Sequence, residues 1–147
     1  MRSRPAREIA GALMVLGGLA AGCGQVKSPT EPAAVPPAAA FSFARVQNEI
    51  FTPSCAKAGC HAAATASGGL VLEAGSSYGQ IVNRPSTENG ALDRIEPGDP
   101  ERSYLIKKLR GDPDISGSRM PLDRPGSLTR EQMDGLAGWV LAGAPGN

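Results

Sequence analysis

The sequence predicts a mainly α-helical domain of three to five short helices joined by long loops. Four segments combine apolar residues at helical spacing with residues that commonly begin or end helices. The chain also contains 19 Gly and 13 Pro, which indicates much loop between the helices. No segment alternates clearly as a strand does, apart from a possible short run at 69–73. These observations together favour a small helical fold.

The first helix is expected to begin after Ser42, which is a favourable N-cap residue. Pro53 is expected to end this helix just before Cys55. The apolar residues between these points have the spacing of a single helix face, and they are Phe43, Val46, Ile50 and Phe51.

Two further helices are expected in the middle of the chain. Ser77 and Gln80 have the spacing of a capping box. Asp99 and Pro100 are typical of a helix start, and Gly111 is typical of a helix end. The expected inward-facing residues are Tyr78, Ile81 and Val82 in one helix and Tyr104, Leu105 and Leu109 in the other. The basic residues that complement the dipole of the later helix are Lys107, Lys108 and Arg110.

The last helix has the clearest signals. Thr129 and Gln132 form a capping box, and Leu128 and Met133 have the spacing of a hydrophobic staple. The apolar stripe then continues to Gly143 through Leu136, Ala137, Val140 and Leu141.

The N-terminal segment 1–22 has the pattern of an export signal. Three arginines precede an apolar stretch at 9–21, and small residues stand just before Cys23. The segment 19–23 resembles the lipobox of bacterial lipoproteins, with Ala20 where leucine is preferred. Cleavage before Cys23 and lipidation of its sulfur would anchor the chain in a membrane. The alternative is an ordinary secretory signal that leaves Cys23 unmodified.

Residues 23–40 are expected to form a linker rich in Pro and Ala, and residues 41–147 a single folded domain. Loss of the signal removes three of 15 Lys and Arg and one of 14 Asp and Glu, which leaves 12 against 13. No basic surface suited to nucleic acid remains, and no second apolar run is long enough to span a membrane. Aromatic residues make up only 4% of the chain, so a large apolar cofactor would supply missing core volume.

The only histidine of the chain directly follows the second of two closely spaced cysteines, in the segment 55–61. The sulfurs of Cys55 and Cys60 could form thioether bonds to the two vinyl groups of a haem, and His61 could then ligate the iron. Four residues separate the cysteines, whereas the usual attachment motif has two. The spacer is therefore expected to bulge outward, and Gly59 can adopt the positive φ that a bulge needs.

This segment resembles the haem motif of c-type cytochromes, in the variant with four residues between the cysteines. The layout of residues 42–143 is also similar to class I cytochromes c, with an opening helix before the motif and a closing helix that carries an aromatic residue, Trp139. The resemblance implies that these two helices cross, with Phe43 or Ile50 against Trp139. It also implies one covalently bound haem c and a single-electron carrier that is not an enzyme.

The second axial ligand cannot be a histidine of this chain, because His61 is the only one. Met120 lies 59 residues later, in a segment at 117–122 where a helix is implausible, and Pro121 would stiffen it. This position resembles that of the axial methionine in class I cytochromes c. The alternative is that Met120 fills a gap in the core. Met133 lies on the stripe of the last helix and is expected in the core.

Other interpretations of the cysteine and histidine cluster remain open. A disulfide between Cys55 and Cys60 would make the chain a non-haem envelope lipoprotein module for binding or structural interactions. A zinc site would lack a fourth ligand, and a Cys–His nucleophile pair usually comes from separate segments. If Met120 does not bind, an open iron site would suit a gas sensor or a haem enzyme.

The leading hypothesis is an exported monohaem electron carrier in the periplasm or cell envelope, anchored to the membrane at Cys23. Its expected partners are redox proteins of the envelope, and nucleic acid is not expected as a partner. Four arginines could pair with haem propionates or could be ordinary surface charges, and they are Arg84, Arg94, Arg119 and Arg124.

Overall fold

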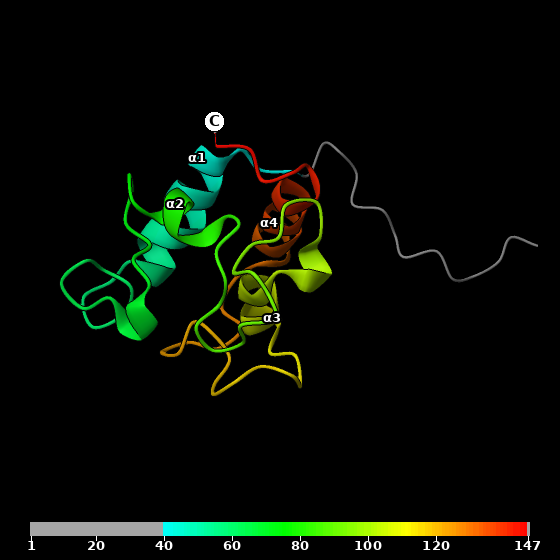
Figure 1. Ribbon diagram of the computed structural model, residues 1–147. Coiled ribbons are helices and arrows are strands. Elements are labelled where there is room, and N and C mark those ends of the chain that lie inside the picture. The colour runs from blue at the N-terminus through cyan, green and yellow to red at the C-terminus, as the bar shows by residue number, and fades with distance from the viewer. Residues whose placement is uncertain (1–39, 147) are drawn as a thin grey trace, which may run out of the picture. The chain divides into compact units, whose positions relative to one another are not determined.

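The computed structural model describes residues 40–146, which contain four α-helices together with other helical segments and long loops (Figure 1). The α-helices are α1 (Phe43–Val46), α2 (Ser77–Ile81), α3 (Tyr104–Arg110) and α4 (Arg130–Leu141). A π-helix, η2 (Gln47–Cys55), continues α1, and two 3-10 helices are η3 (Ser67–Gly69) and η4 (Pro100–Arg102). The prediction of a small, mainly helical fold is confirmed.

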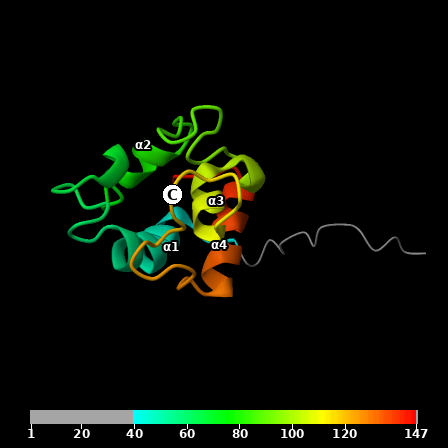
Figure 2. The same cartoon turned by 90° about the horizontal axis from the view of Figure 1, so that it is seen from below.

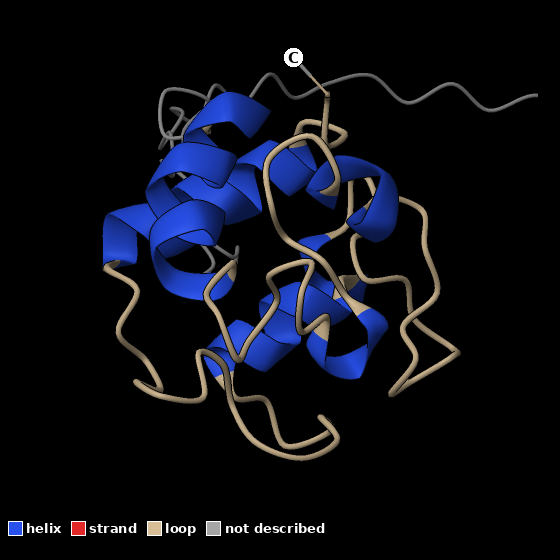
Figure 3. Ribbon diagram, turned by 90° about the vertical axis from the view of Figure 1, so that its left-hand side faces the viewer, coloured by secondary structure: helices blue, strands red, loops and turns tan. Residues whose placement is uncertain are grey.

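Within residues 40–146, β-type pairing is limited to two isolated bridges, Val82 with Ile95 and Pro85 with Asp93. The short strand considered at 69–73 is therefore wrong, and Figure 3 shows only helices and loops. None of the helices in this range is long and apolar enough to cross a membrane. The export signal, Cys23 and nearly all of the linker lie outside the described residues.

The first helix begins as predicted but does not end before Pro53. The Ser42 hydroxyl accepts a hydrogen bond from the Arg45 backbone N–H at 3.3 Å, and the helix then runs on in π register to Cys55. In an α-helix, the ring of Pro53 would clash with the Glu49 carbonyl. Proline also has no backbone N–H that could donate a hydrogen bond to this carbonyl. Here the Glu49 carbonyl accepts a hydrogen bond from the Gln132 side chain of α4 at 2.7 Å. The helix thus continues past Pro53 in π register, and its Glu49 carbonyl also bonds to α4.

α1 lies against α4, and both views in Figures 1 and 2 place these helices side by side. The ring centroids of Phe43 and Trp139 are 5.6 Å apart, so one of the two contacts that the resemblance implied is present. A Cβ atom on Gly135 would lie 2.2 Å from the ring of Phe41, so the glycine permits this close approach. The Phe41 N–H donates to the Gly135 carbonyl at 3.0 Å. The residues just before α1 are therefore part of the packed domain.

The predicted capping box of α2 is wrong. The helix begins after Ser76, while the Ser77 hydroxyl donates to the side-chain oxygen of Gln47 and the Gln80 oxygen accepts from the Val71 N–H at 2.9 Å. Both polar side chains are thus used in contacts between distant segments rather than in a local cap.

The helix predicted from Asp99 forms as two segments. Asp99 caps the 3-10 helix η4, and α3 starts only after Ser103, whose hydroxyl donates to the Asp99 carbonyl at 2.8 Å. Gly111 ends α3 with a φ of 79°, as predicted. The capping box of Thr129 and Gln132 at the start of α4 is also confirmed.

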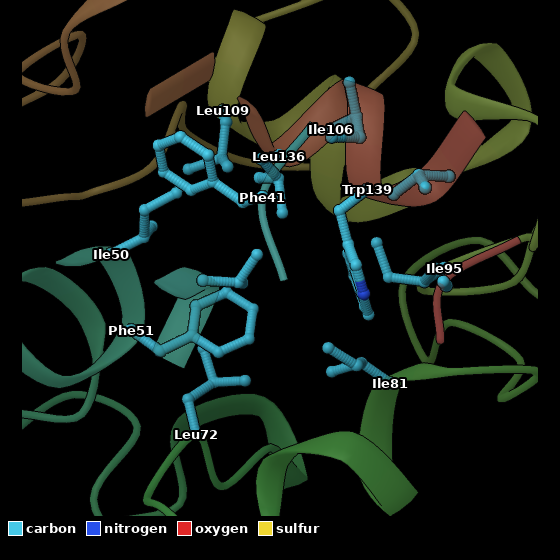
Figure 4. Packing of buried hydrophobic residues seen from close by; sticks show 13 residues of the cluster. Phe41, Ile50, Phe51, Leu72, Ile81, Ile95, Ile106, Leu109, Leu136 and Trp139 are labelled. Carbon is cyan, nitrogen blue, oxygen red and sulfur yellow. The ribbon is translucent and has the colours of Figure 1, made fainter. Parts of the chain in front are cut away.

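The core lies between α1, η2, α3, α4 and the segments that follow the cysteine motif (Figure 4). Trp139 is fully buried near Ile81 and Ile95, and Phe51 lies beside Leu72. Of the stripe predicted for α4, Leu136 and Val140 are fully buried, but Leu141 is 51% exposed. The stripe ends before Leu141 because the inward face of α4 passes through Trp139 and Val140.

Candidate functional site

A cleft opens beside the core between the cysteine motif and the segment that contains Met120. It encloses about 1020 Å³ when the space of its open mouth is included. Cys55, Cys60, His61 and Met120 all line it, and all four are half-buried. Much of the remaining wall is apolar and includes Phe51, Leu70, Leu72, Leu105, Leu109 and Leu122.

The two cysteines are brought to the cleft by a helix end and a tight turn. Cys55 is the last residue of η2, and its Sγ lies 3.7 Å from the Ile50 carbonyl oxygen. The spacer then loops out, with Gly59 at a φ of 82°, and the His61 N–H returns to the Cys55 carbonyl at 3.1 Å. The outward bulge and the positive φ of Gly59 were both predicted from the sequence and are confirmed.

Neither Cys55 nor Cys60 forms a disulfide; both are free thiols. Burial raises the pKa of the Cys55 thiol to about 12, well above its usual value. Cys55 is therefore almost entirely protonated at neutral pH in this fold.

The imidazole of His61 is oriented by the backbone of the following loop. Its Nδ1 lies 3.2 Å from the Leu70 carbonyl oxygen, and a carbonyl can only accept, so Nδ1 must carry the proton in this bond. The Leu72 N–H in turn donates to the His61 carbonyl at 2.8 Å. The Nε2 atom of the neutral ring then keeps its lone pair for a metal, which is the arrangement typical of a ligating histidine.

Met120 is held by the backbone of α3. Its N–H donates to the Lys108 carbonyl at 2.9 Å, and the preceding Arg119 donates from Nε to the Leu109 carbonyl at 2.8 Å. The Met120 side chain lines the cleft and also packs against the core cluster. Met133 packs against the same cluster but does not line the cleft, as expected of a core residue.

One wall of the cleft is polar, and the sequence interpretation missed it. Lys108 Nζ lies 2.9 Å from Glu88 Oε2 and donates to the Ser116 carbonyl at 2.7 Å. The Tyr104 hydroxyl also donates to Glu88, at 2.9 Å. Burial alone would raise the pKa of the Glu88 carboxyl, but the hydrogen bonds from Lys108 and Tyr104 hold it below its usual value. Lys108 lies in the last turn of α3, as predicted, but it is only 8% exposed, so its ammonium group is part of this wall.

The spacing of Tyr104 and Lys108 in the sequence indicates that both side chains belong to this polar wall. Lys108 follows Tyr104 by four residues and therefore lies on the inward face of α3. Of the four arginines considered for haem propionates, Arg94 lines the cleft, and its guanidinium donates to the Gln80 carbonyl at 2.9 Å. The other three, Arg84, Arg119 and Arg124, are exposed and do not line it.

Across residues 40–146, no group of three or more His, Cys, Asp and Glu side chains is arranged to hold a metal ion. Comparison with family models, with curated proteins and with solved structures finds no match to this chain.

Proposed function

We propose that this chain is a single-electron carrier of the cell envelope that binds one haem covalently through Cys55 and Cys60. The observation that carries the proposal is the convergence of two thiols, one imidazole and one thioether on a single, largely apolar cleft. His61 and Met120 are 59 residues apart in the sequence and reach this cleft from different loops. No local sequence rule requires that convergence.

The residues present fit a c-type haem. Each cysteine sulfur can form one thioether, and both are free and at the cleft. The hydrogen bond from His61 Nδ1 to Leu70 leaves Nε2 free, so His61 and Met120 are the two side chains that would bind the iron. A haem bound in this way exchanges one electron between its ferrous and ferric forms.

The other residues of the cleft have separate tasks. The leucines and Phe51 would exclude water from the iron, while the thioether of Met120 would favour the ferrous form and raise the reduction potential. If His61 and Met120 both bind the iron, no position would be left for a substrate. Lys108 and Arg94 keep N–H groups beyond those already bonded, and these would be donors for the cofactor's carboxylates. The membrane anchor at Cys23, the export of the chain and redox proteins as partners remain part of the same proposal.

The test is an absorption spectrum, oxidised and reduced, of the full-length chain exported in a host that has haem-maturation proteins. The proposal expects sharp low-spin bands on reduction and a haem stain that persists on a denaturing gel. A colourless protein with an oxidised Cys55–Cys60 pair would contradict it and would favour the disulfide-stapled module. A stained protein whose reduced form readily binds carbon monoxide would contradict the Met120 assignment alone.

A further inference from the structure

An ion pair crosses the rim of the cleft between the cysteine spacer and the segment after Met120. Lys57 Nζ lies 3.3 Å from Asp123 Oδ2, although the residues are 66 positions apart. The Lys57 side chain is 33% exposed and the Asp123 side chain is 48% exposed. Among the ion pairs of residues 40–146, this one alone joins the two segments.

The longer spacer is what brings Lys57 to this position. The Cys60 N–H donates to the Lys57 carbonyl at 2.9 Å, so Lys57 begins the turn that bulges between the two cysteines. A spacer of the usual two residues has less chain from which to build such a bulge. On the other side, the Arg124 N–H donates to the Pro121 carbonyl at 3.2 Å and forms the turn that contains Asp123.

The segment after Met120 has few other attachments. Met120 and Arg119 are bonded to the backbone of α3. The described residues 121–127, in contrast, make hydrogen bonds only with one another, apart from the bond between Asp123 and Lys57. This segment forms one side of the cleft, since Pro121, Leu122 and Asp123 line it. Loss of the ion pair therefore removes the one polar link that holds this side of the rim.

We propose that Lys57 and Asp123 form a clasp that holds segment 121–123 over the cleft and limits access to the site beside Met120. The clasp gives the four-residue spacer a positional role in addition to cofactor attachment. Its strength is modest because both side chains are partly exposed, and salt weakens it. Arg124, whose Nε is 3.6 Å from Asp123 Oδ2, is a second partner for the carboxylate when Lys57 moves away. The role of the clasp toward the haem rests on the proposed function, but its existence does not.

The test uses the purified full-length chain and amide hydrogen exchange. Lys57→Met keeps the aliphatic stem and removes the charge, whereas Lys57→Arg keeps the charge. Lys57→Met should speed exchange at the Arg124 amide by about two- to fivefold, and Lys57→Arg should leave it near the parent rate. High salt should speed exchange at this amide in the parent but not in Lys57→Met. Arg130→Met is the matched control, because it breaks the exposed Arg130–Asp134 pair at 3.4 Å within α4.

Equal exchange at Arg124 in the parent and Lys57→Met would overturn the clasp, as would an equal change in Arg130→Met. In haem-loaded protein, Lys57→Met should also bind added imidazole at the iron faster than the parent, and unchanged binding would overturn the gating role. If the purified chain contains no haem, the exchange experiment still decides whether the clasp exists. Failure of the clasp and failure of the proposed function are thus distinguishable.

Discussion

At the scale of single residues, Met120 and Met133 are chemically identical but have different surroundings. Met120 lines the cleft, whereas Met133 packs only against the core cluster. Under the proposed function, Met120→Ala should lower the reduction potential and open the iron to added ligands, because the soft thioether is lost. Redox titration and imidazole binding measure both effects.

Met133→Ala is the matched control for this substitution. It removes the same side chain from a half-buried site, so we expect it to lower the free energy of unfolding by about 1–2 kcal/mol without changing the potential. A potential that is unchanged in Met120→Ala, or equally lowered in both variants, would rule out Met120 as a ligand.

The thiol of Cys55 should also react slowly in protein made without haem-maturation proteins. Burial raises the pKa of Cys55 to about 12, so its reactive thiolate is scarce at pH 8. Alkylation of Cys55 at pH 8 should therefore accelerate about a hundredfold or more in denaturant, where its pKa returns to the usual value near 8.5. Mass spectrometry of the alkylated peptides measures the rate at each cysteine. Equal rates in folded and denatured protein would show that Cys55 is not buried.

The same shift predicts a pH dependence of stability. When the pKa of a thiol is higher in the folded than in the unfolded protein, the thiol contributes fully to stability at pH values below its unfolded pKa. This contribution falls as the pH rises from the unfolded pKa toward the folded pKa of about 12. Haem-free protein should thus lose stability as the pH is raised above about 8.5, and Cys55→Ala should lose less over the same range. Denaturant unfolding at several pH values measures the difference. An equal loss in both proteins would assign the effect to other groups.

At the scale of elements, the first helix shows why local rules predict the start of a helix better than its end. Ser42 acts within its own turn, so the sequence alone identifies it. The helix instead runs past Pro53 in π register, and its Glu49 carbonyl accepts a bond from Gln132, which is 83 residues away. A proline rule that considers only neighbouring residues cannot include this donor.

The same distinction applies to the site. The cysteines and His61 are adjacent in the sequence, and the loop composition around Met120 separates it from Met133, so these residues could be proposed from the sequence. The Leu70 carbonyl and the Glu88 partner of Lys108 could not be, because loops of unpredictable conformation bring them there. Sequence patterns thus identified the reactive groups, and long-range packing supplied their orientation.

The close packing of Phe41 against α4 depends on Gly135. Its substitution by alanine would place Cβ 2.2 Å from the Phe41 ring, which cannot be accommodated without moving the ring or the helix. We expect Gly135→Ala to lower the free energy of unfolding by about 1–3 kcal/mol, although alanine is the better helix former. Denaturant unfolding measures the change.

Gly79 in α2 provides the matched control. No atom lies within 4 Å of a Cβ built there, so Gly79→Ala should stabilise the fold by about 0.5–1 kcal/mol through helix propensity alone. Equal effects of the two substitutions would show that the contact between Phe41 and α4 does not limit the packing.

At the scale of the whole molecule, the cleft and the core share side chains. Phe51, Leu72 and Leu109 belong to the buried cluster and also form part of the cleft wall. These side chains are at most 5% exposed, so an apolar group bound in the cleft would add packing contacts to the same residues that hold the helices together. Binding of the cofactor and stability of the fold should be coupled.

This coupling separates the two interpretations of the cysteine motif. His61→Ala leaves both cysteines in place, so a disulfide could still form, but the proximal ligand of a haem would be lost. Under the proposed function, the variant should hold less haem and unfold at least about 10 °C below the haem-loaded parent, as thermal unfolding followed by circular dichroism would show. If His61→Ala and the parent unfold at the same temperature and neither is coloured, the cleft does not depend on an iron ligand. The free thiols of Cys55 and Cys60 would then have to be explained without haem.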